Sequence, residues 1–147
     1  MPYWLPDTHR LQLGVGTTLR EGSDLVFIGY GPVLLSEAYR AAVALEQDGV
    51  RAAVVNLPWL NRVDAPWLLR TIAEKQLVVS LDNHLPIGGQ GDRIAEVIAQ
   101  TRFAAAPPLL RFAVETVPAC GSNAAVLEHH GLSAQRMRER VLRALRG

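Results

Sequence analysis

The stretch that most constrains the fold spans residues 77–100 and reads LVVSLDNHLPIGGQGDRIAEVIAQ. It opens with the apolar run Leu77–Val79, which is typical of a strand buried on both faces. The polar residues Asp82–His84 end the strand because their side chains favour leaving the ladder. Glycines in the segment Gly88–Gly91 permit tight turns, and from Asp92 apolar residues recur at helical spacing. This stretch therefore predicts a strand, a glycine-rich turn and a helix over 92–101.

Apolar runs that indicate strands alternate with helical patterns along the rest of the chain. The helical patterns carry local signals of helix ends, such as proline in the first turn, a capping side chain or a closing glycine. Strands that alternate with helices form a mostly parallel sheet covered on both faces. We therefore expect an α/β fold, a three-layer α/β/α sandwich of about five strands. The expected strands are 11–19 at an edge, Leu25–Ile28, Ala52–Leu57, Leu77–Leu81 and Leu109–Val114, and the expected end signals are Pro32, Gly49, Asp64, Ser122 or Asn123, Gly131 and Ser133.

The glycine-rich turn has two interpretations. Glycines expose backbone N–H groups and a helix amino end carries partial positive charge, which together suit a phosphate. However, GGQGD lacks the Lys-Ser/Thr pair of a P-loop, is not GxGxxG, and places Asp92 where it would repel an anion. Gly29 and Gly31 likewise lack the third glycine of a dinucleotide fingerprint. A structural turn is favoured, in which Gly88 and Gly89 hold a conformation that only glycine adopts cheaply.

Charge and cysteine content exclude several partners. Fifteen basic and fourteen acidic residues leave a net charge of +1, which gives no long-range field for nucleic acid or an anionic membrane. No apolar run approaches the ~18 residues of a membrane span, and the first ten residues lack a signal-peptide core. The single cysteine, Cys120, agrees with a reducing compartment. We therefore expect a cytoplasmic protein with neither a nucleic-acid nor a membrane partner.

The remaining reactive side chains form no recognisable catalytic or metal site. Adjacent histidines His129 and His130 would point about 100° apart on a helix, and no zinc-ligand spacing occurs. No serine lies in a G-x-S-x-G elbow. The arginines of the last helix favour a solvated face, because positive charge near a helix carboxyl end is stabilised by the macrodipole.

A resemblance to a known family rests on four stretches in a fixed order. Asp82 and His84 at a strand end, followed by Gly88-Gly89-x-Gly91 and a helix, resemble the C-terminal domain of transketolase-like, thiamine-diphosphate-dependent enzymes. That family includes transketolases, 1-deoxyxylulose-5-phosphate synthases and the beta subunits of 2-oxo acid dehydrogenases. The other similar stretches are Arg20–Asp24 followed by LVFIGYG, Leu57–Asp64, and Gly131–Ala134, so that the similarity spans roughly residues 12–145.

The resemblance implies a domain organisation and a set of motif positions. Residues 1–10 would be a linker-like segment, residues 11–147 the transketolase C-terminal-like domain, and the first strand antiparallel at the sheet edge. Apolar surface normally covered by other domains would be exposed, with Tyr3, Trp4, Trp59 and Trp67 as candidates. The family-motif residues, which also mark a candidate ligand or interface edge, are Asp64, Asp82, His84, Gly88, Gly89 and Gly91.

The resemblance further implies a supporting role. The chain would be the third domain or small subunit of a thiamine-diphosphate-dependent transferase or 2-oxo acid dehydrogenase, with other domains or subunits as partners in a homo- or hetero-oligomer. Thiamine diphosphate and Mg²⁺ would bind only in the assembled enzyme, since Gly91-Asp92-Arg93 is not the Gly-Asp-Gly motif that holds them. The isolated chain is then expected to be inactive. The alternative is an independent small-ligand or nucleotide-binding α/β module that uses the carboxyl edge near Tyr30, Asn56 and Asp82–Gly91.

Overall fold

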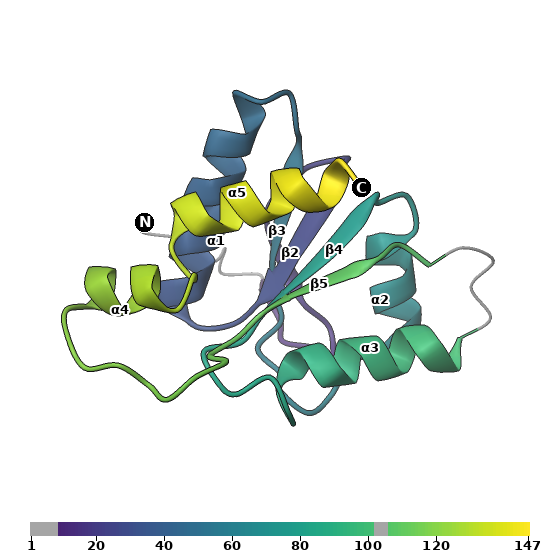
Figure 1. Cartoon of the computed structure of the whole chain (residues 1–147). Coiled ribbons are helices and arrows are strands. Elements are labelled where there is room, and N and C mark those ends of the chain that lie inside the picture. The colour runs from purple at the N-terminus through teal and green to yellow at the C-terminus, as the bar shows by residue number, and fades with distance from the viewer. Residues whose placement is uncertain (1–8, 102–105) are drawn as a thin grey trace.

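A five-stranded sheet lies between two layers of helices in the computed structural model, which describes residues 9–101 and 106–147 (Figure 1). The strand order is β1-β3-β2-β4-β5. Four neighbouring strands are parallel, and β1 pairs antiparallel with β3 at one edge. The predicted α/β sandwich with an antiparallel first strand is therefore confirmed. The strands are β1 (Thr17–Arg20), β2 (Leu25–Gly29), β3 (Ala52–Asn56), β4 (Leu77–Leu81) and β5 (Leu109–Phe112).

Two helices pack on each face of the sheet, and a short fifth helix lies beside the first (Figure 1). Helices α1 and α5 cover one face, whereas α2 and α3 cover the other. The helices are α1 (Pro32–Glu46), α2 (Ala65–Ile72), α3 (Gln90–Gln100), α4 (Asn123–His129) and α5 (Ala134–Leu145).

The central strand β2 divides the core in two. Leu25 and Phe27 belong to the cluster under α1 and α5, and Val26 and Ile28 belong to the cluster under α2 and α3. All four side chains are fully buried, as alternation along a strand between two helical layers requires. Both clusters consist of residues of this chain, so the domain supplies its own core.

The helix ends follow the predicted local chemistry. Asp64 caps α2 by accepting a hydrogen bond from the Trp67 backbone N–H at 2.8 Å. Ser122 and Ser133 cap α4 and α5. The predicted edge strand over 11–19 is too long, because Gln12 to Val15 form a turn, closed by a hydrogen bond between the Val15 N–H and the Gln12 carbonyl, and β1 begins only at Thr17.

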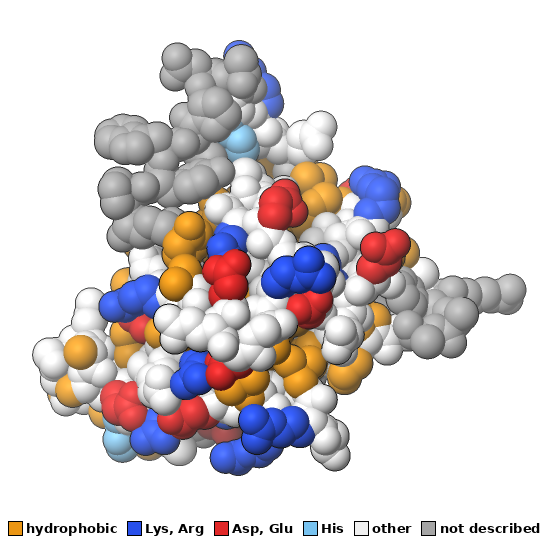
Figure 2. All heavy atoms as spheres, turned by 90° about the horizontal axis from the view of Figure 1, so that it is seen from above, with side chains coloured by type: hydrophobic (Ala, Val, Ile, Leu, Met, Phe, Trp, Pro, Cys, Tyr) orange, Lys and Arg blue, Asp and Glu red, His pale blue; other side chains and the backbone are white. Residues whose placement is uncertain are grey.

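The exposed apolar side chains are not the predicted tryptophans. Trp59 and Trp67 are half-buried against the cluster under α2 and α3, while Tyr3 and Trp4 lie outside the described residues. Seen from above Figure 1, the surface carries basic and acidic side chains interspersed with small apolar areas (Figure 2). Among the described residues, no helix combines the length and the hydropathy needed to cross a membrane.

Candidate functional site at the carboxyl edge of the sheet

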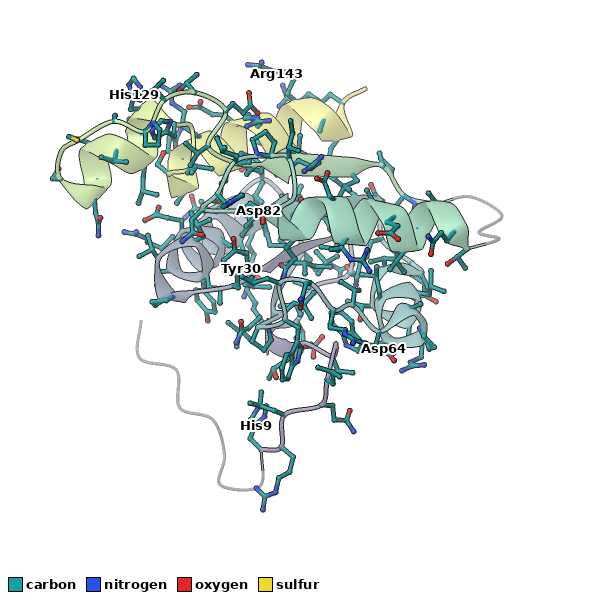
Figure 3. All side chains as sticks on the ribbon, turned by 90° about the horizontal axis from the view of Figure 1, so that it is seen from below. His9, Tyr30, Asp64, Asp82, His129 and Arg143 are labelled. Carbon is teal, nitrogen blue, oxygen red and sulfur yellow. The ribbon has the colours of Figure 1, made fainter. Side chains whose placement is uncertain are left out.

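The carboxyl ends of the parallel strands bring together residues that are distant in the sequence. Tyr30 follows β2, Asn56 ends β3, and Asp82 follows β4, so the three lie along one edge of the sheet. Figure 3 shows Tyr30 and Asp82 close to each other, with the Tyr30 hydroxyl 3.4 Å from Asp82 Oδ1. This is the edge at which open α/β sheets bind ligands, and it is the candidate site that the sequence indicated.

Asp82 is the centre of this edge. Its side chain is only 1% exposed, and both carboxylate oxygens are used. Oδ1 accepts a hydrogen bond from the Gln90 N–H at 2.8 Å, and Oδ2 accepts one from the Gly91 N–H at 2.9 Å. Negative charge at a helix amino end is favourable, since unpaired N–H groups point towards it. Asp82, which follows β4, therefore caps the amino end of α3.

The structure corrects two predictions about the glycine-rich turn. Helix α3 begins at Gln90 and not at Asp92, because the Asp82 carboxylate satisfies the N–H groups of the first two helical residues. Positive φ occurs at Gly88, with φ 78°, whereas Gly89 has φ −77°. The left-handed conformation that favours glycine is thus confirmed at Gly88 and wrong for Gly89.

Gly89 and Gly91 are required for space and not for backbone conformation. A Cβ on Gly89 would lie 2.8 Å from Asp82 Cγ, and one on Gly91 would lie 2.7 Å from Ser80 Oγ. Both distances are shorter than side-chain carbon atoms normally tolerate. The motif glycines therefore let the turn approach Asp82 closely, so that the Asp82 carboxylate can accept hydrogen bonds from the first N–H groups of α3.

Burial and the neighbouring carboxylate change the acidity of Tyr30. Burial comes first, followed by the negative charge of Asp82, and together they raise the pKa of Tyr30 to about 12 from its ordinary value of 10.0. The phenol thus stays neutral in the folded protein at pH values where an unfolded tyrosine has begun to ionise. Its stabilising contribution is fully present below pH 10 and is lost as the pH rises towards 12.

We expect a Tyr30→Phe variant to lose this alkaline dependence. The free energy of unfolding, measured with urea on both sides of pH 10, should fall less steeply with pH in the variant than in the unsubstituted chain. A slope in Tyr30→Phe equal to that of the unsubstituted chain would contradict the assignment of the alkaline dependence to Tyr30.

Gln90 connects this edge to a second loop. Its side chain is buried, and Nε2 donates hydrogen bonds to the carbonyl oxygens of Leu57 at 2.8 Å and Trp59 at 3.1 Å. The first residue of α3 therefore fixes the loop that follows β3. Gln90 is not among the residues predicted from the sequence, because a glutamine between glycines carries no local signal of a long-range contact.

Arg111 and Asp92 hold the turn from its other side. Arg111 Nη1 lies 2.8 Å from Asp92 Oδ1, and its Nη2 donates to the Pro86 carbonyl oxygen. Asp92 Oδ2 in turn accepts the Gly88 N–H at 2.6 Å. The sequence predicts that Asp92 repels an anion at the helix start, and in the structure the charge of Asp92 pairs with Arg111.

The other two motif residues do not join the Asp82 cluster. His84 is exposed, its Nδ1 lies 2.9 Å from the Leu85 carbonyl oxygen, and its own carbonyl accepts the Val114 N–H. Asp64 caps α2 and lies apart from Asp82 in Figure 3. Of the six motif residues, Asp82 and the glycines Gly88, Gly89 and Gly91 form the closed turn.

The described residues do not suit a diphosphate held through a metal ion. The N–H groups at the start of α3, which would receive a phosphate, already donate to Asp82. Within 9–101 and 106–147, no group of three or more His, Cys, Asp and Glu side chains is arranged to hold a metal ion. An anionic ligand at this edge would have to displace a buried carboxylate, so the arrangement does not favour an independent nucleotide-binding module.

The sequence comparisons with known proteins agree on one protein family. Residues 14–137 match the model of the transketolase C-terminal domain. The 1-deoxy-D-xylulose-5-phosphate synthase of Heliobacterium modesticaldum is 32% identical over 133 residues, which are 90% of this chain and 20% of the synthase. The putative transketolase C-terminal section of Methanocaldococcus jannaschii is 29% identical over 136 residues, 92% of this chain and 41% of that protein.

Solved structures agree with the sequence comparisons. A structure described as "Split gene transketolase, inactive beta4 tetramer" superposes with a TM-score of 0.85 at 30% identity, covering 98% of this chain and 46% of that one. A transketolase of Pichia stipitis superposes with a TM-score of 0.67 at 18% identity, over 90% of this chain and 18% of the enzyme, which shows the same fold. The chain thus spans less than half the length of each of these relatives.

Proposed function

This chain belongs to the transketolase C-terminal domain family, and we propose that it is the third domain, or a small subunit, of a transketolase-like thiamine-diphosphate-dependent enzyme. Its role would be to support assembly and subunit contacts, without a catalytic group of its own. The assembled enzyme would be a cytoplasmic homo- or hetero-oligomer. The observation that carries the proposal is the closure of the carboxyl edge by the buried Asp82, which uses the N–H groups of α3 internally.

The split relative supports a division of labour between polypeptides. Its chain is about twice the length covered here and is described as the inactive beta4 tetramer of a split-gene transketolase. We infer that the groups that hold thiamine diphosphate and Mg²⁺ lie on domains outside this chain. When bound there, the cofactor would supply the carbanion chemistry of ketol transfer. The residues of this chain would contribute positioning through the contacts of the domain.

We expect the chain alone to give no titration heat with thiamine diphosphate and Mg²⁺, since its carboxyl edge is already filled by Asp82. Mixed with the polypeptide that carries the remaining domains, it should restore ketol-transfer activity. A His84→Ala variant should restore activity to within about twofold of the unsubstituted chain, since the exposed His84 is assigned no catalytic role. Micromolar cofactor binding by the chain alone, or loss of turnover in His84→Ala, would contradict the proposal.

A further inference from the structure

Three exposed apolar side chains lie on the two loops that Gln90 connects. Leu60 is 50% exposed on the loop after β3, and Leu85 and Ile87 are 52% and 85% exposed on the loop after β4. We call these three residues the apolar loop surface. A single exposed aliphatic residue needs no explanation, whereas a contact surface gathers several of them, and the bonds of Gln90 place these three on adjoining loops.

The loops that carry these residues are held in place. Gln90 binds the carbonyl oxygens of Leu57 and Trp59, which brings the first loop against the start of α3. The second loop is fixed by the bond from the Gly88 N–H to Asp92 and by the contact of Arg111 with the Pro86 carbonyl. A surface whose backbone is already ordered loses little conformational entropy when a partner covers it.

Two acidic groups at these loops are paired within the chain, whereas Arg62, Asn83 and His84 are exposed on the same loops. The carboxylates of Asp82 and Asp92 are used by backbone N–H groups and by Arg111, so burying the loops beneath a partner would leave neither carboxylate unpaired. The opposite side of the molecule carries charges of both signs with small apolar areas among them (Figure 2). At the carboxyl edge, an interface with an apolar centre over the three aliphatic side chains and a polar rim at the exposed loop residues fits the composition of the two loops.

The segment before β1 reaches the same edge of the sheet. Its Gly14 carbonyl accepts the Asp64 N–H at 2.9 Å, and it carries the exposed Leu11 and Leu13. In relatives that match this C-terminal family domain, most of the enzyme lies outside the matched segment. On this basis we propose that the apolar loop surface docks onto an apolar surface of the remaining domains of the enzyme. This inference rests on the function proposed above and names its contact surface.

The test measures binding of this chain to the polypeptide that carries the remaining domains, by titration calorimetry or analytical ultracentrifugation. We expect Ile87→Glu to raise the Kd at least about tenfold, since a charge would be buried at an apolar contact, and Leu60→Glu to act in the same direction. Val43→Glu is the matched control, since Val43 is 45% exposed on the outer side of α1, and its Kd should stay unchanged. All three variants should keep the melting temperature of the unsubstituted chain, because the substituted side chains are exposed.

The outcomes separate the two proposals. Absence of binding by the unsubstituted chain would overturn the proposed function and this inference with it. Binding that is equally strong in Ile87→Glu would overturn the inference alone. A homodimer of this chain that Ile87→Glu dissociates would show that a second copy, and not the remaining domains, occupies the surface.

Discussion

Replacing Gly22 with alanine should lower the free energy of unfolding by about 3 kcal/mol or more, because the new methyl group has no space. A Cβ at this position would lie 2.2 Å from the Ala52 carbonyl carbon and 2.3 Å from the Ala53 nitrogen. Both are backbone atoms at the start of β3, so no side-chain rotation can relieve the contact. Urea unfolding followed by circular dichroism would measure the loss.

Gly49→Ala is the control, since it separates lack of space from backbone conformation. Gly49 has φ 79° but no atom within 4 Å of an added Cβ, so alanine there should cost only about 1 to 2 kcal/mol of backbone strain. An equal or smaller loss in Gly22→Ala would show that β3 moves away from the methyl group. A larger loss in Gly22→Ala than in Gly49→Ala would show that the turn before β2 needs glycine for lack of space. The φ of Gly22 does not itself require a glycine.

The secondary structure was largely predictable from the sequence because its signals are local. The predicted bounds of β4 agree with the structure. Asp64 and Ser133 are predictable as helix caps, because a short polar side chain before a helical pattern satisfies N–H groups within the same turn. The antiparallel β1 came only from the family resemblance. Nothing in its four residues distinguishes an antiparallel neighbour from a parallel one.

The candidate site was predictable in position but not in its chemistry. Asp82 was placed correctly at the end of β4, yet its bonds to Gln90 and Gly91 depend on where α3 packs relative to the sheet. The same packing decides that Gly88 needs its backbone conformation whereas Gly89 needs its missing side chain. The sequence shows that glycines are present, and only the tertiary contacts assign each one a reason.

Removing the Asp82 carboxylate is the second large effect that we expect. Asp82→Ala should lower the free energy of unfolding by about 2 to 4 kcal/mol, because it leaves two N–H groups of α3 without an acceptor in a buried site. Asp82→Asn should lower the free energy of unfolding less than Asp82→Ala does. The asparagine amide oxygen can still accept one of the two hydrogen bonds, while the asparagine NH₂ group faces the other N–H. Urea unfolding and hydrogen exchange of the first-turn amides of α3 would measure both effects.

Asp64→Ala provides the comparison, because Asp64 is also a helix cap but is only half-buried and receives one backbone N–H. The loss of unfolding free energy in Asp64→Ala should be about 1 kcal/mol.

Sulfate provides a further test, if Asp82 holds the place that an anion would otherwise take. Sulfate should stabilise Asp82→Ala more than the unsubstituted chain, because the freed N–H groups of Gln90 and Gly91 can then bind it. A loss in Asp82→Ala no larger than in Asp64→Ala would mean that water readily replaces the carboxylate, and that the carboxyl edge is open to ligands after all.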